Sequence, residues 1–134
     1  SIGLVGSEMC IRDSPIACAV GVASLTLTLE RDVPARLEAI GARIHAELRS
    51  LSSDPRVRDV RHLGGMAALD LVVPADDAGY LSSRAPAIRR AAVEKGVLLR
   101  PLGDVLYALP PACTSDEEAG RIGQTMCALV DELY

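Results

Sequence analysis

The 134-residue sequence has very few aromatic side chains: three tyrosines, and neither phenylalanine nor tryptophan. The core must therefore be built from Leu, Val, Ile and Ala. The hydrophobic content of 49% is ample for one core in a chain of this length. Basic runs are also missing, and the net charge is -4. Because nucleic-acid surfaces cluster Lys and Arg, this composition argues against a nucleic-acid partner.

Long apolar runs and metal-binding motifs are missing too. The longest apolar stretch, within residues 14–29, is rich in small residues and too short to cross a bilayer comfortably, so we expect a soluble protein without a membrane partner. The cysteines, Cys10, Cys18, Cys113 and Cys127, form no Cys-x-x-Cys pair or Cys/His cluster, which predicts no metal site. The last three fit small apolar packing positions in a reducing, cytoplasmic compartment.

Helical periodicity is clearest over residues 33–51, whose apolar side chains recur on one face: Val33, Leu37, Ile40, Ile44, Leu48 and Leu51. Asp32 can cap this helix. Residues 15–30 predict an earlier apolar helix with small residues on several faces, which implies burial on more than one side. In isolation that surface would be exposed.

Two more helices are expected in the second half of the chain. Residues 83–95 predict a helix closed by Gly96. The last helix begins at Ser115, which forms a capping box with Glu118. Its buried stripe comprises Ile122, Met126, Leu129, Val130 and Leu133.

Strands are predicted at residues 57–63, 66–73 and 105–109, with Gly64-Gly65 as a strand break rather than a phosphate loop. Asp70 interrupts the second strand. If buried, it needs a backbone donor or an arginine as partner, and a satisfied structural carboxylate is favoured over a site contact.

Together these elements predict one α+β unit over residues 14–134, a small antiparallel sheet with helices packed on it. His45 falls on a helix and His62 on a strand. Both are interpreted as surface or packing residues rather than catalytic ones.

The most informative segment, GVLLRPLGDVLYALPP at residues 96–111, contains one arginine, Arg100. Pro101 favours an extended backbone at Arg100, and Gly103-Asp104 permits a tight reversal, so Arg100 is expected at the end of a strand. Its guanidinium would suit bidentate carboxylate recognition. The local pattern by itself favours the alternative, a structural ion pair.

Four blocks of the sequence carry a family resemblance: SPIACAVGVASL from Ser14, VRDVRHLGGMAALDL from Val57, AGYL from Ala78, and GVLLRPLGDVLYALPPACTSDEE from Gly96. They resemble the C-terminal part of class III pyridoxal-phosphate aminotransferases. The resemblance implies the C-terminal small domain of a fold-type I pyridoxal-phosphate enzyme, which is a homodimer when full-length.

The Arg-Pro-Leu-Gly block is most similar to the family's biotin-pathway enzyme, which transfers an amino group from S-adenosylmethionine to 8-amino-7-oxononanoate, giving 7,8-diaminononanoate. Arg100 matches the arginine that binds the substrate carboxylate in that family, and Tyr107 is a weaker second candidate. The family's catalytic lysine and its cofactor-binding aspartate have no match. The sole lysine, Lys95, precedes a helix-ending glycine. We therefore expect no catalytic or cofactor-binding residues here, no covalent pyridoxal phosphate and no activity of this chain alone.

Residues 4–13, LVGSEMCIRD, match a translated sequencing adapter, so residues 1–13 are expected to be non-native. Cys10 stands where the family has a threonine that binds the cofactor phosphate of the neighbouring subunit. The natural sequence is therefore expected to begin near Ser14, within a truncated gene.

Three alternatives remain open. The chain could belong to another class III transaminase that acts on an ω-amino acid or a diamine. It could instead be a stand-alone α+β module that binds a carboxylate, or a structural oligomerisation domain. The apolar helix expected before residue 30 argues against a self-contained module, which would rarely leave such a surface uncovered.

Overall fold

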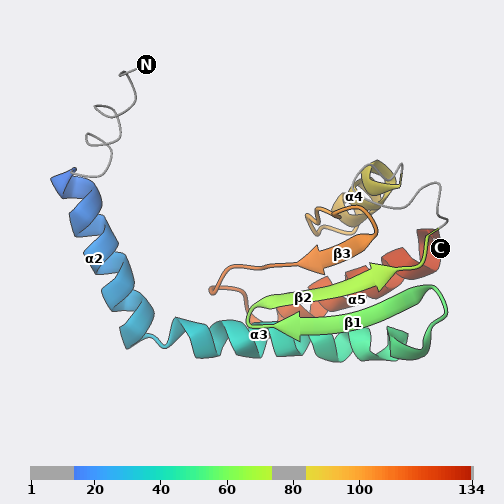
Figure 1. The fold of residues 1–134 in the computed structure, drawn as a ribbon, viewed down its shortest axis with the longest axis horizontal. Coiled ribbons are helices and arrows are strands. Elements are labelled where there is room, and N and C mark those ends of the chain that lie inside the picture. Colours follow the sequence, from blue (N-terminus) through green and yellow to red (C-terminus); the bar gives the residue numbers. More distant parts are fainter. Residues whose placement is uncertain (1–13, 74–83, 134) are drawn as a thin grey trace, which may run out of the picture. The chain divides into compact units, whose positions relative to one another are not determined.

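A computed structural model describes residues 14–73 and 84–133 of the chain (Figure 1). The predictions for residues 1–13, for the AGYL block and for the loop at 74–80 lie outside the described residues. The chain divides into two compact units, residues 1–33 and 34–134, which are treated separately.

The first unit contains helix α2, Pro15–Glu30, with the predicted bounds. Ser14 is its N-cap: the Ser14 hydroxyl accepts a hydrogen bond from the Ala17 N–H (3.4 Å), and Pro15 suits the first turn because it has no N–H to satisfy. None of the residues of α2 is buried, and Ile16 and Leu29 are 77% and 79% exposed. As expected for this helix in isolation, its apolar surface has no cover within its own unit.

Asp32 does not cap the following helix, so that prediction was wrong. Its φ is +44°, whereas an N-cap residue has an extended backbone. The Asp32 N–H donates to the Leu29 carbonyl oxygen (3.2 Å), as the Arg31 N–H does to that of Leu27 (3.1 Å). These contacts end α2 in a left-handed turn, which an aspartate tolerates better than most residues.

The second unit holds the predicted small antiparallel sheet with helices packed on it, whereas helix α2, which the prediction placed in the same α+β unit, belongs to the first unit (Figure 1). The three strands are antiparallel in the order β1-β2-β3. Two long helices cover one face of the sheet, and the shorter α4 packs against the last helix. The elements are α3 (Val33–Leu48), the 3-10 helix η1 (Arg49–Ser53), β1 (Val57–Leu63), β2 (Met66–Leu71), α4 (Ala85–Glu94), β3 (Val105–Ala108) and α5 (Asp116–Leu133).

The core lies between the sheet and helices α3 and α5, and aliphatic residues fill it as the composition requires. Ile44, Leu48 and Leu69 are completely buried. From the predicted helical stripes, the structure buries Ile40, Ile44, Leu48, Leu51, Met126, Leu129 and Val130, with Ile122 and Leu133 partly buried. The stripe of α5 is therefore confirmed, and that of α3 from Ile40 onward, whereas Val33 and Leu37 at its start are only half-buried.

Strands β1 and β2 form a hairpin in which Leu63 faces Met66 across the two-residue turn Gly64-Gly65. Gly64 has a φ of +54°, which glycine adopts without strain. The turn lies against α3 at Gly41: a Cβ atom there would be 2.0 Å from the Gly64 carbonyl oxygen. The glycine pair is thus a hairpin turn in close contact with a helix.

The predicted helix ends are confirmed around α4 and α5. The Glu118 carboxylate accepts from the Ser115 N–H (2.7 Å), and the Ser115 hydroxyl accepts from the Glu118 N–H (3.2 Å), which is the capping box. The Ser115 N–H and hydroxyl both donate to the Glu118 carboxylate, and these two bonds lower the pKa of Glu118. After α4, Gly96 has a φ of +78°, and the Val97 N–H donates to the Ala92 carbonyl oxygen (3.0 Å), as in a Schellman motif.

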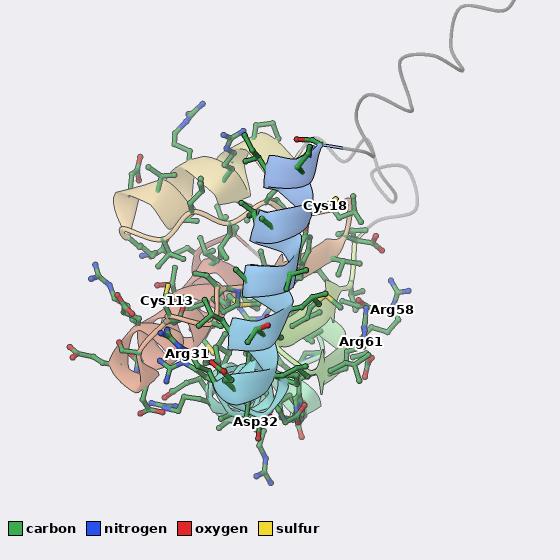
Figure 2. The ribbon with its side chains drawn as sticks, turned by 90° about the vertical axis from the view of Figure 1, so that its left-hand side faces the viewer. Cys18, Arg31, Asp32, Arg58, Arg61 and Cys113 are labelled. Atoms are coloured by element: carbon green, nitrogen blue, oxygen red, sulfur yellow. The ribbon has the colours of Figure 1, made fainter. Side chains whose placement is uncertain are left out.

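Asp70 has the arginine partner that its place in a strand requires. It lies opposite Asp59 in the register of β1 and β2, which sets two like charges side by side. Arg61 on β1 pairs with both, at 2.9 Å from Asp59 and 2.8 Å from Asp70. The bond to Asp70 is the main cause of the raised pKa of Arg61. Arg58 and Arg61 both extend from β1 in Figure 2. Asp70 therefore has the predicted arginine partner as an ion pair, but its buried Oδ1 accepts no hydrogen bond of good geometry, so the prediction of a satisfied carboxylate is met only in part.

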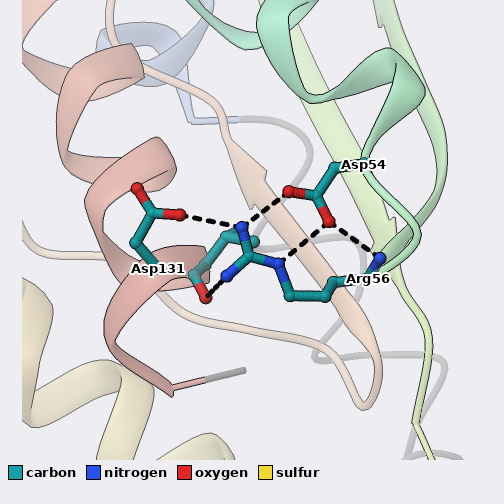
Figure 3. Close-up of polar contacts among 4 residues, drawn as sticks. Asp54, Arg56 and Asp131 are labelled. Atoms are coloured by element: carbon teal, nitrogen blue, oxygen red, sulfur yellow. Dashed lines mark hydrogen bonds and ion pairs between the residues drawn. The ribbon is translucent and has the colours of Figure 1, made fainter.

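Arg56 links the start of the sheet to the end of α5 (Figure 3). Its guanidinium pairs with Asp54 (2.6 Å) and with Asp131 (2.8 Å), and it donates to the Val130 carbonyl oxygen (3.2 Å). Hydrogen bonds from the Arg56 side chain and N–H lower the pKa of Asp54 from its ordinary 3.8 to about 2. The network therefore depends on an ionised Asp54.

The pKa of Asp54 predicts an acid-sensitive contribution to stability. Since the folded pKa is depressed, the unfolded chain takes up a proton first on acidification. The contribution is present above pH 3.8 and is lost as the pH falls toward about 2. Urea unfolding at a series of pH values should show a smaller loss of stability across this window in D54N than in the parent. D32N, which removes a carboxylate outside the network, should keep the parental slope. Equal slopes in parent and D54N would contradict the prediction.

Candidate functional site

Arg100 lies outside any strand, which corrects the prediction that it ends one. The predicted reversal is present: Leu102 and Val105 exchange two backbone hydrogen bonds (2.9 and 3.1 Å) across Gly103-Asp104. The ladder ends at this pair, with no further bridge to β3 among residues 97–101. The segment before the turn is therefore an isolated stretch of chain beside β3.

Burial alternates along this segment and directs Arg100 outward. Val97 and Leu99 are buried in the core, whereas Leu98 is 74% exposed and Arg100 is exposed. Within residues 14–73 and 84–133, no hydrogen bond or ion pair engages the Arg100 guanidinium. The structural ion pair that the local pattern favoured is thus not formed by the part of the chain that the structure describes.

Arg100 and Tyr107 line one groove of about 730 Å³. The segment at 96–100, the end of β3 with the prolines after it, and the first half of α5 form its walls. Tyr107 is half-buried. The structure therefore brings together the two residues that the sequence singled out, which are seven positions apart. Their roles toward a substrate remain predictions.

The other charged groups of this groove have structural partners. Glu118 belongs to the capping box, and Arg121 donates to the Lys95 carbonyl oxygen (3.2 Å). The loop before α5 is held by Arg36 of α3, which donates to the carbonyl oxygens of Ala112 and Thr114. Arg100 thus differs from Arg121 in having no hydrogen-bond partner among the described residues, and all its donors are open to an incoming carboxylate.

A second groove, of about 540 Å³, also includes Arg100. Its other wall is α4, which contributes Arg89, Arg90 and Glu94. The sequence alone did not predict this arrangement. The sequence shows only that Arg89 and Arg90 are adjacent in a predicted helix. Their proximity to Arg100 depends on the path of the chain after Gly96, which brings Arg100 back beside α4.

His45 and His62 pack against each other, with ring centroids 4.7 Å apart. Nε2 of His62 lies 3.1 Å from a carboxylate oxygen of Glu38. Burial, followed by the charges of His62 and Arg49, lowers the pKa of His45. In the described ranges, no three His, Cys, Asp or Glu side chains are grouped to hold a metal ion. The pair joins α3 to β1 as packing residues, an association that sequence spacing could not reveal.

Lys95 has a structural partner as well. Its ammonium lies 2.5 Å from a carboxylate oxygen of Glu132, so that it links the end of α4 to α5. The cysteines match the packing interpretation only in part: Cys127 is partly buried, whereas Cys18 and Cys113 are exposed. Cys18 lies on α2, and Cys113 lies in the loop before α5.

Comparison with known proteins defines the family. The family model for aminotransferase class-III matches residues 12–130. The chain belongs to the class III aminotransferase family. Solved transaminase structures have a fold similar to that of this chain. An amine transaminase from an uncultivated Pseudomonas species, in the PLP-bound internal aldimine form, is 29% identical with a TM-score of 0.77 and covers 90% of this chain and 28% of its own. The predicted fold class, a part of a fold-type I enzyme, is confirmed.

Two curated relatives have the same name, adenosylmethionine-8-amino-7-oxononanoate aminotransferase. The protein of Synechococcus elongatus is 39% identical over 120 residues, which cover 90% of this chain and 27% of the relative. The protein of Mycobacterium leprae is 33% identical over 129 residues, which cover 94% of this chain and 28% of the relative. The chain thus spans little more than a quarter of the length of these relatives. Among the helices of the described ranges, none has the length and apolar character needed to cross a membrane.

Proposed function

We propose that this class III aminotransferase chain is the C-terminal part of a pyridoxal-phosphate enzyme of biotin biosynthesis. The whole enzyme would transfer an amino group from S-adenosylmethionine to 8-amino-7-oxononanoate, giving 7,8-diaminononanoate. It would be a cytoplasmic homodimer. The names of two relatives at 33–39% identity support this reaction, and the share of their length that the chain covers supports a larger enzyme.

The observation that carries the proposal is Arg100, exposed in a groove beside Tyr107 and without a partner in the described residues. 8-Amino-7-oxononanoate ends in a carboxylate. A guanidinium donates two parallel hydrogen bonds to a carboxylate and remains charged at any working pH. Arg100 would therefore hold the end of the substrate remote from the reacting carbonyl carbon, so that this carbon is presented in a fixed position.

The chain itself does not fit covalent attachment of pyridoxal phosphate. The cofactor is an electron sink bound through a lysine, and a reactive lysine needs a desolvated or cationic environment that lowers its pKa. The sole lysine, Lys95, is instead paired with Glu132. We therefore propose that the cofactor is held by a part of the enzyme outside this chain, and that this chain alone does not transaminate.

The second candidate is another class III transaminase, acting on an ω-amino acid or a diamine. The amine transaminase at 29% identity favours it, because that structure also covers 90% of the chain. A stand-alone carboxylate-binding module remains a third reading, and it requires Arg100 to bind a ligand without any chemistry.

The test is to recover the reading frame upstream of Pro15 from the source DNA and to assay the encoded enzyme. Amino transfer from S-adenosylmethionine to 8-amino-7-oxononanoate should exceed transfer from ω-amino acids or diamines. The 134-residue chain is the matched control: it should show no turnover and no borohydride-trapped imine at Lys95. Preference for a diamine donor would select the second candidate. A native start codon just before Ser14 would contradict the proposal.

A further inference from the structure

The groove between α4 and the segment around Pro101 gathers positive charge in an otherwise acidic protein. Arg89 and Arg90 of α4 line it together with Arg100, and Glu94 is the one carboxylate among the described residues of its lining. The described lining therefore has a net charge of about +2, whereas the whole chain has a net charge of -4. Such local concentration of one sign attracts ligands of the opposite sign.

These arginines lack the carboxylate partners that four other arginines of the unit have. Four arginines on α3 and β1 or just before it each pair with a carboxylate at 2.6–3.5 Å: Arg43, Arg56, Arg58 and Arg61. For Arg89, Arg90 and Arg100, no hydrogen bond or ion pair is formed within residues 14–73 and 84–133. Glu94, one turn after Arg90, is likewise unpaired in these ranges. The donors of three guanidiniums thus face the groove or solvent.

The rest of the lining is apolar. Ala85, Pro86, Val93 and Pro101 complete it, and the Val93 side chain is 54% exposed. A volume of about 540 Å³ is within the range of small-molecule sites. Guanidinium donors match the oxygens of carboxylates and phosphates, and the net charge is balanced by two negative charges.

We propose that this groove is an anion site for a small ligand with two negatively charged oxyanion groups, of the pyrophosphate or dicarboxylate kind. Arg100 is shared with the larger groove, so a dianion bound here competes with a carboxylate bound there. The site goes beyond the proposed aminotransferase function, since Arg89 and Arg90 have no part in it. It is a property of this chain and is tested on this chain.

The experiment is titration calorimetry of the 134-residue chain with sodium pyrophosphate, and separately with succinate, at low ionic strength. The parent should bind at one saturable site. R89Q/R90Q should weaken binding about tenfold or more, as expected when charge-assisted hydrogen bonds are removed. The matched control is R31Q/R49Q, which removes two exposed arginines outside the groove and changes the net charge equally. It should alter affinity by less than about twofold.

R100Q should also lose affinity, because Arg100 completes the groove. Binding of pyrophosphate alone would identify the phosphate class, and binding of succinate alone the carboxylate class. Equal weakening by R89Q/R90Q and R31Q/R49Q would show general electrostatic attraction and overturn the site. Absence of saturable binding of both probes, or unchanged affinity in R100Q, would overturn it too. Because the substituted arginines are exposed, the fold should be unaffected, which thermal unfolding of each variant verifies.

Discussion

G41A is expected to destabilise the α+β unit by about 3 kcal/mol or more, in the upper range for overpacking substitutions. A Cβ atom at position 41 would lie 2.0 Å from the Gly64 carbonyl oxygen and 3.3 Å from the Gly65 carbonyl carbon. Both neighbours are backbone, so neither can be relieved by a side-chain rotation. The helix or the hairpin turn must move, and either movement disturbs the core between them.

The matched control is G21A, the same substitution in the middle of α2. A Cβ atom there has no neighbour within 4 Å. Because alanine is a better helix former than glycine, G21A should be neutral or slightly stabilising. Urea unfolding followed by far-UV circular dichroism measures both changes. A G41A midpoint close to that of the parent would show that the turn tolerates displacement from α3.

R100A in the full-length enzyme should weaken binding of the keto substrate by about 2–5 kcal/mol, the cost of removing one partner of a desolvated charge pair. This corresponds to a rise in KM of about thirtyfold to several thousandfold. R100K should recover only part of the loss, because an ammonium cannot replace the two-pronged guanidinium. The prediction rests on Arg100, whose guanidinium has no hydrogen bond or ion pair within the described residues.

The control for R100A is R49A, which removes an exposed arginine outside both grooves. It should leave the KM for the keto substrate unchanged. The kinetics are measured at a saturating amino donor, so that a change reports on the keto substrate. An unchanged KM in R100A would exclude Arg100 from carboxylate binding.

The sequence was sufficient wherever structure is determined by near neighbours. Helix α2, the buried stripes of α3 and α5, and the capping box of Ser115 and Glu118 all involve residues within a few turns of one another. Their side chains have the periodicity or the hydrogen-bonding groups that these elements require. The turns at Gly64 and Gly103 were predictable for the same reason, since glycine tolerates the positive φ found at both.

The expected strand before Pro101 was wrong because pairing is a property of two segments. Its residues have strand-like composition, yet they form a single bridge to β3, between Leu102 and Val105. Asp32 shows the same limit at a helix end. An aspartate before a helix favours a cap, but the backbone there follows the turn that closes α2.

By itself the sequence determined the class of fold, the helices and the choice of Arg100, because apolar periodicity, capping residues and a motif can be read along the chain. The tertiary structure alone decided what surrounds these residues: Arg61 beside Asp70, His45 against His62, and Arg89 and Arg90 in one groove with Arg100. Such contacts join residues on different elements. They are fixed by how the helices and strands pack on a common core, which no local pattern encodes.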